Sequence, residues 1–162
     1  MNAPNINVWG PALWSILHGL AEKTGFKTAE KPEGEEKRLW RSLLMTLRHS
    51  IPCPRCQKHY NDYVNQHPYH PLFAFKGGEW GSALRTYLWT FHNAIRTTNG
   101  QSLDFPVERL ETYRSATKAS LIEWKRLYAD NMRKGLPFYF LTREDMLRCL
   151  RLIEELLLFL VY

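Results

Sequence analysis

The sequence is poor in cysteine. Three cysteines occur among 162 residues; two stand close together as Cys53-Pro54-Arg55-Cys56, and Cys149 lies far away. Because there is no second pair, the sequence does not favour a scaffold held together by several disulfides. Two thiols separated by two residues can close into a disulfide, bind a metal or pass electrons between partners. We therefore expect Cys53 and Cys56 to take part in chemistry.

Long apolar runs and blocks of one charge are also missing. The longest apolar stretch, residues 156–161, is far too short to span a bilayer. The first residues show neither a basic start followed by an apolar run nor an Arg-rich transit segment. Lys and Arg give a net charge of +6 but are scattered along the chain. We expect a cytoplasmic protein with no signal peptide, no membrane span and no nucleic-acid partner.

Aromatic residues, in contrast, are plentiful. Six Trp, eight Tyr and eight Phe make up 14% of the chain. Such side chains can fill a core, or they can form the walls of a pocket for a large flat ligand. Composition alone leaves both possibilities open.

Apolar residues recur at helical spacing over almost the whole chain. The pattern predicts helices at about 11–24, 35–50, 53–64, 80–98, 107–134 and 142–160, with loops at 27–34 and 66–78. Pro11 suits a first helical position, and Thr142 suits an N-cap. No strand pattern and no internal repeat stand out, so the predicted fold class is all-α.

The predicted third helix places Cys53 at its N-terminus. The positive end of the helix dipole stabilises a thiolate there, and Arg55 adds a neighbouring cation. We expect both Cys53 and Cys56 to have a lowered pKa when reduced. A thiolate at neutral pH is the species that attacks disulfides or donates electrons.

Three interpretations of the pair remain at this point. A thioredoxin-like oxidoreductase needs a βαβ setting, and no strand precedes the pair. A zinc site would combine Cys53 and Cys56 with two histidines, and the candidates are His59, His67 and His70. Such a site would belong to a zinc-stabilised helical binding module. The third interpretation is a dithiol that works against a bound organic cofactor.

Three segments resemble motifs of the Erv/ALR family of FAD-linked sulfhydryl oxidases. Residues 9–21, WGPALWSILHGLA, are similar to its opening WGxxxWxxLHxxA helix. Residues 51–60, IPCPRCQKHY, resemble its PCxxC helix, and residues 87–95, YLWTFHNAI, resemble the flavin-binding helix that ends in a His-Asn pair. Together the motifs cover roughly residues 8 to 105, in the family's order.

This resemblance implies a four-helix bundle that holds FAD, with additional C-terminal helices. Substrate thiols would attack the Cys53–Cys56 disulfide, with Cys53 exchanging with substrate and Cys56 facing the flavin. Reduced FAD would pass the electrons to O₂ and produce hydrogen peroxide, in a flavoprotein oxidoreductase that forms disulfide bonds in other proteins. Cofactor contacts are expected from matching or neighbouring positions: Trp9, Gly10, Pro11, Trp14, His18, Tyr60, Tyr63, Tyr87, His92 and Asn93.

The sequence departs from the family pattern on the third motif. Tyr87 stands where the family usually has Trp, and Trp89 stands where it usually has a cysteine, so the family's extra structural disulfide is not expected. The family's second asparagine is missing, and the next residue is Arg96, which is either a phosphate contact or a surface residue. These departures concern the adenine and ribose contacts more than the flavin ring.

The C-terminal third lies outside the resemblance. We expect a core domain at residues 1–105 and a helical extension at 106–162, whose apolar last helix either packs on the bundle or forms a dimer contact. Family members are commonly homodimers, so a homodimer is expected. There is no second cysteine pair, and Cys149 is expected to be buried and inert. A single-pair oxidase resembles viral forms, which implies a thioredoxin-like relay partner and a place in the host cytoplasm or virion.

Overall fold

The protein is built from helices packed in three layers. A computed structural model describes residues 2–27, 29–101 and 106–161. The main helices of the first two thirds are α1 (Ile6–Glu22), α2 (Glu30–Ser50), α3 (Pro54–Gln66) and α4 (Gly77–Thr98), with a short 3₁₀ turn, η1 (His70–Ala74), between the last two. No strand occurs in these described ranges, so the all-α prediction is confirmed.

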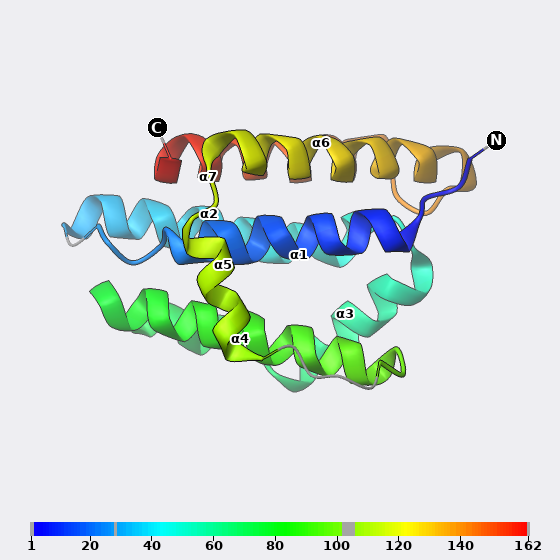
Figure 1. Cartoon of the computed structure of the whole chain (residues 1–162). Helices are drawn as coiled ribbons and strands as arrows, with labels where there is room; N and C mark the ends of the chain where they lie inside the picture. The colour runs from blue at the N-terminus through cyan, green and yellow to red at the C-terminus, as the bar shows by residue number, and fades with distance from the viewer. Residues whose placement is uncertain (1, 28, 102–105, 162) are drawn as a thin grey trace.

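The chain then continues into a second group of helices. A 3₁₀ turn, η2 (Val107–Leu110), leads into the short α5 (Glu111–Arg114). Two long helices follow, α6 (Lys118–Gly135) and α7 (Arg143–Val161), joined through η3 (Leu136–Phe138). In Figure 1, α1 and α2 form the middle layer, α6 and α7 lie along one side of it, and α4 and α3 lie on the other.

One hydrophobic cluster runs through all three layers. It includes Trp40 and Trp80 from the first helices and Tyr128 and Ile153 from α6 and α7, each 0% exposed. Burial of large side chains of this kind contributes about 1.5–3 kcal/mol each. The C-terminal helices therefore pack back on the bundle, which is the first of the two arrangements expected for the apolar last helix.

Two predicted helix starts were wrong. The first helix begins at Ile6, because the Asn5 side chain accepts a hydrogen bond from the backbone N of Asn7 and caps it. Pro11 thus lies inside the helix, where the bond to the Asn7 carbonyl is lost, but Asn7 is exposed to water. The second helix begins at Glu30, so most of the predicted 27–34 loop is helical.

The predicted helix 107–134 was wrong as a single element. The chain breaks after α5, and Thr117 starts α6 through reciprocal hydrogen bonds between its own and the Ser120 side chain and backbone. This break lets α5 lie across α1 while α6 runs along the outer side of the molecule (Figure 1). The Thr142 cap was right: its hydroxyl accepts from the backbone N of Asp145.

Candidate functional site

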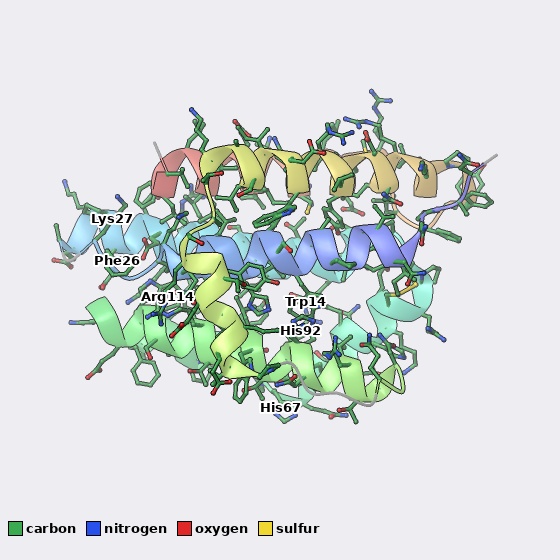
Figure 2. All side chains as sticks on the ribbon, viewed as in Figure 1. Trp14, Phe26, Lys27, His67, His92 and Arg114 are labelled. Carbon is green, nitrogen blue, oxygen red and sulfur yellow. A yellow bond between two sulfur atoms is a disulfide. The ribbon has the colours of Figure 1, made fainter. Side chains whose placement is uncertain are left out.

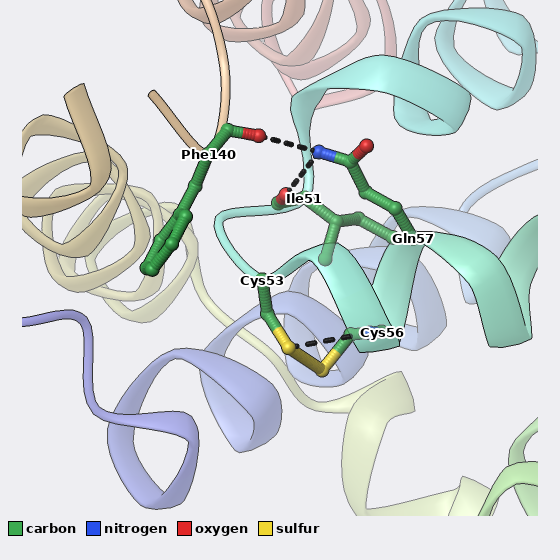
Figure 3. Close-up of a disulfide and its surroundings, with 5 residues drawn as sticks. All are labelled: Ile51, Cys53, Cys56, Gln57 and Phe140. Atoms are coloured by element: carbon green, nitrogen blue, oxygen red, sulfur yellow. Dashed lines mark hydrogen bonds between the residues drawn. A yellow bond between two sulfur atoms is a disulfide. The ribbon is translucent and has the colours of Figure 1, made fainter. Parts of the chain in front are cut away.

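Cys53 and Cys56 form a disulfide at the start of α3. Cys53 is the N-cap residue, and its sulfur accepts a hydrogen bond from the backbone N of Cys56 at 3.2 Å. Pro54 occupies the first turn, where its missing N–H costs nothing. Figure 3 shows the pair with its neighbours. The helix N-terminus predicted for Cys53 is therefore confirmed, while the lowered pKa of the reduced thiols stays a prediction.

A cavity of about 550 Å³ opens beside this disulfide. It lies among α1, α3, α4 and the η2–α5 segment, and Cys56 is one of its lining residues, whereas Cys53 is not. The two sulfurs are thus inequivalent: both cysteines are half-buried, but only Cys56 lines the cavity. Cavities of this size are typical of sites for cofactors and other large ligands.

The cavity walls are largely aromatic. Trp9, Trp14, Tyr60 and Phe91 line it, and Phe91 stacks on Tyr63 behind it with ring centroids 4.0 Å apart. The Tyr60 hydroxyl donates to the Leu44 carbonyl at 2.5 Å, and burial raises its pKa well above the usual value. Such walls offer flat apolar surfaces against which a planar ring system can stack.

A pair of buried histidines stands at the cavity wall. His18 Nε2 and His92 Nδ1 lie 3.0 Å apart, and Trp14 stacks on the His92 ring with centroids at 4.2 Å and planes 7° apart (Figure 2). Burial lowers the pKa of His18 to about 4. Burial, helped by the charges of His18 and Arg96, lowers that of His92 to about 3. Both rings are therefore neutral at pH 7, one donating the shared proton and the other accepting it.

Cations gather at part of the same wall. Arg96 and Arg109 line the cavity, as does Arg55 near the disulfide. Guanidinium groups are suited to bind phosphate oxygens through paired hydrogen bonds. Arg96 was expected to be either a phosphate contact or a surface residue. Its place in the cavity lining favours the first alternative.

Six of the ten expected cofactor contacts line the cavity: Trp9, Gly10, Pro11, Trp14, Tyr60 and His92. The other four lie behind or beside it. His18 bonds to His92, Tyr63 backs Phe91, and Asn93 follows His92 in α4. The Tyr87 hydroxyl donates to the His67 carbonyl at 2.6 Å. His67 ends α3, so this contact lies at the opposite end of the helix from the disulfide. Cofactor contact by all ten stays a prediction.

Sequence reasoning missed the residues that the C-terminal segment brings to the site. Arg109 and Tyr113 line the cavity, and the Tyr113 ring lies over His18 with centroids 5.1 Å apart. Both belong to the segment that was expected to be one continuous helix, so no motif drew attention to them. No sequence signal pointed to them, because apolar residues keep their helical spacing across the break before Thr117 that lets α5 fold back over α1.

The structure does not support the zinc alternative. Within residues 2–27, 29–101 and 106–161, no group of three or more His, Cys, Asp or Glu side chains is placed to hold a metal ion. Cys53 and Cys56 are joined to each other, and the His67 ring packs on Tyr63 at 4.6 Å between centroids. In the same ranges no helix is both long and apolar enough to cross a membrane.

Comparison with known proteins places the chain in a family. Residues 11–114 match the Erv1 / Alr family, which is more than half of the chain, and the chain belongs to it. Over 57 residues it is 35% identical to a protein of Frog virus 3 (isolate Goorha) named "Putative FAD-linked sulfhydryl oxidase 088R". That match covers 35% of this chain and 37% of the viral protein. No solved structure matches the chain.

Proposed function

We propose that this protein is a sulfhydryl oxidase that forms disulfide bonds in protein substrates. The observation that carries the proposal is the position of Cys56: it is half of a disulfide at a helix N-terminus, and it lines a large aromatic cavity. Membership of the Erv1 / Alr family and the name of the Frog virus 3 relative support the same function.

The residues of the pair divide the work. A substrate thiolate attacks the Cys53 sulfur, the Cys53–Cys56 bond breaks, and Cys56 leaves as a thiolate that the N-terminus of α3 stabilises. A second substrate thiolate then releases Cys53 and completes the substrate disulfide. Because Cys56 lines the cavity and Cys53 does not, Cys56 is the sulfur placed to pass the electron pair inward.

The cavity fits FAD as the acceptor of those electrons. Its aromatic walls suit a planar ring system, and Arg96 and Arg109 suit a pyrophosphate. Trp14 and the neutral His18–His92 pair would orient the group without adding a charge beside it. When bound, FAD supplies a two-electron acceptor that can be reoxidised by O₂ with release of H₂O₂.

Other expectations remain predictions. A homodimer, a thioredoxin-like relay partner and a location in host cytoplasm or virion follow from the family resemblance alone. The division into a core at 1–105 and an extension at 106–162 is likewise a prediction, although the family match ends at residue 114, before α6 begins.

Purified full-length protein tests the proposal. We expect a yellow solution with stoichiometric flavin in its absorbance spectrum, no zinc in a metal assay, and oxygen uptake with dithiothreitol. Cys53→Ser and Cys56→Ser should each lower that uptake by a factor of about 1,000 or more, because neither exchange step can then be completed. Cys149→Ser is the matched control and should keep most activity, since Cys149 is buried in α7. Full activity in either single variant of the pair would contradict the mechanism.

A further inference from the structure

The loop between α6 and α7 exposes a cluster of aromatic side chains. Phe138, Tyr139 and Phe140 are consecutive; Tyr139 is 92% exposed and Phe138 is 41% exposed. The Phe138 and Phe140 rings stack with their centroids 5.3 Å apart. Exposed aromatic clusters of this kind mark surfaces that bind other molecules, because removing their apolar area from water is favourable.

The backbone at the tip of this loop is also strained. Tyr139 has φ 59° and is the only residue other than glycine with a positive φ within 2–27, 29–101 and 106–161. Glycine or asparagine adopts that conformation more easily than a bulky aromatic residue does. The conformation closes the end of η3, where the backbone N of Tyr139 donates to the Leu136 carbonyl at 3.0 Å and that of Phe140 to the Gly135 carbonyl at 3.2 Å. Folding therefore accounts for the backbone, but not for a bulky, exposed aromatic side chain at this position.

Hydrogen bonds hold the loop next to the disulfide. Gln57 of α3 donates through Nε2 to the Phe140 carbonyl at 2.8 Å and to the Ile51 carbonyl at 2.7 Å (Figure 3). The backbone N of Cys53 donates to the same Ile51 carbonyl at 2.8 Å. One amide group thus joins the α6–α7 loop to the backbone that precedes the exchanging cysteine.

Close packing at the base of the loop keeps this arrangement. Gly135 ends α6 against Pro52, the residue before Cys53, and a Cβ at Gly135 would lie only 3.3 Å from the Pro52 Cβ. Figure 3 shows Phe140 on the Cys53 side of the disulfide rather than on the Cys56 side. Phe140, which follows Phe138 and Tyr139 in the chain, therefore lies toward the cysteine that does not line the cavity.

The charge beside the disulfide is positive. Arg55 lies between the two cysteines in the first turn of α3, is exposed, and makes no ion pair within the ranges that the structure describes. Arg55 also lines the cavity, as Cys56 does, so a carboxylate that approaches the disulfide from solvent would come near this guanidinium. Together with the neighbouring rings, Arg55 fits a segment that carries both an apolar and an acidic side chain.

We propose that Phe138 and Tyr139 form the docking surface for the cysteine-bearing segment of a protein substrate, one with apolar and acidic side chains next to its reactive cysteine. This deepens the proposed function and rests on it. Docking holds the segment while its thiolate bonds to the Cys53 sulfur and Cys56 leaves as thiolate. A second substrate thiolate then attacks the substrate sulfur of that mixed disulfide, and Cys53 leaves. The substrate loses two electrons and two protons, the Cys53–Cys56 pair gains the two electrons, and bound FAD would supply the acceptor that allows the pair to return to the disulfide.

The test compares three thiol probes on full-length flavin-loaded protein. The first is a synthetic dithiol peptide with two leucines and two glutamates beside its first cysteine. The second has serines and lysines in those places, and the third is dithiothreitol. We expect the double variant Phe138→Ser/Tyr139→Ser to raise KM for the first peptide about tenfold, with unchanged kcat and unchanged rates for dithiothreitol. The second peptide should bind weakly to both forms of the protein.

Two further variants separate docking from folding. Phe26 is 73% exposed at the end of the molecule opposite the start of α3, so Phe26→Ser should leave all three rates unchanged (Figure 2). Tyr139→Gly relieves the strained φ, so we expect a Tm no lower than that of the parent protein but a KM for the first peptide several-fold higher.

The outcomes distinguish the two proposals. If the parent protein consumes no oxygen with dithiothreitol, the proposed function itself fails. If it does, but the double variant and Tyr139→Gly oxidise the leucine- and glutamate-bearing peptide with the parent's KM, the docking surface is wrong. The same conclusion follows if the serine- and lysine-bearing peptide is oxidised as efficiently as the first.

Discussion

His18 and His92 are the residues whose chemistry depends most on their surroundings. Each ring is buried, and each lies against another aromatic ring: Tyr113 on His18 and Trp14 on His92. From the sequence, both were expected to contact the cofactor. Their mutual hydrogen bond could not be predicted, because the two residues are 74 positions apart and the contact depends on how α1 and α4 pack.

The buried pair should make the protein less stable in acid. Because the pKa values are lowered to about 4 and about 3, the unfolded chain binds more protons than the folded one below about pH 6.5. The free energy of unfolding should therefore be highest above pH 6.5 and fall toward pH 4 by on the order of 3 kcal/mol for each of the two histidines. Urea unfolding at pH 7, 5.5 and 4.5 measures this slope.

A double variant isolates that effect from the titration of carboxylates. His18→Phe/His92→Phe removes both polar partners at once and should flatten the slope between pH 6.5 and pH 4. His49 is exposed on α2, so His49→Gln should retain the parent slope. An equal slope in the double variant would show that the pair does not titrate in this way.

At the scale of single elements, the start of α3 was the most predictable part of the site. Pro54 and the cysteine spacing define that helix start locally, so the sequence alone was enough to place Cys53. The start of α6 was not predictable in the same way, because apolar residues keep their helical spacing across the break. There the Thr117–Ser120 cap starts a new helix although the apolar spacing continues. The preceding α5 is therefore a separate helix that packs on α1 at the cavity.

Gln57 should stabilise the contact between α3 and the α6–α7 loop. Gln57→Leu removes the donor to the Ile51 and Phe140 carbonyls while keeping a side chain of similar size. We expect a loss of about 1–2 kcal/mol in the free energy of unfolding. Chemical denaturation measures it. Lys58→Ala, one residue further along α3, removes only an exposed pair with Asp62 and should change stability by less than about 0.5 kcal/mol.

At the scale of the whole molecule, the sequence predicted helices throughout but not how the two halves combine. The family match ends at residue 114, yet the hydrophobic cluster continues into α6 and α7. Those helices cover α1 and α2, the helices that carry Trp9 and Leu44 to the cavity. Helical periodicity identifies an apolar face but does not say which partner covers it, so dimer contact and internal packing were equally consistent with the sequence.

If the C-terminal helices and the helices around the cavity share one core, a substitution in α7 should also lower the stability of the cavity helices. Leu156 is 0% exposed in α7 and belongs to the common cluster, so Leu156→Ala should cost about 2–5 kcal/mol. We expect helical circular dichroism and tryptophan fluorescence, which is dominated by residues outside α7, to report a single transition with the same lowered Tm. Leu158 in the same helix is 47% exposed, so Leu158→Ala should shift Tm little. Two separate transitions in Leu156→Ala, with tryptophan fluorescence unshifted, would mean that the C-terminal helices unfold independently of the site.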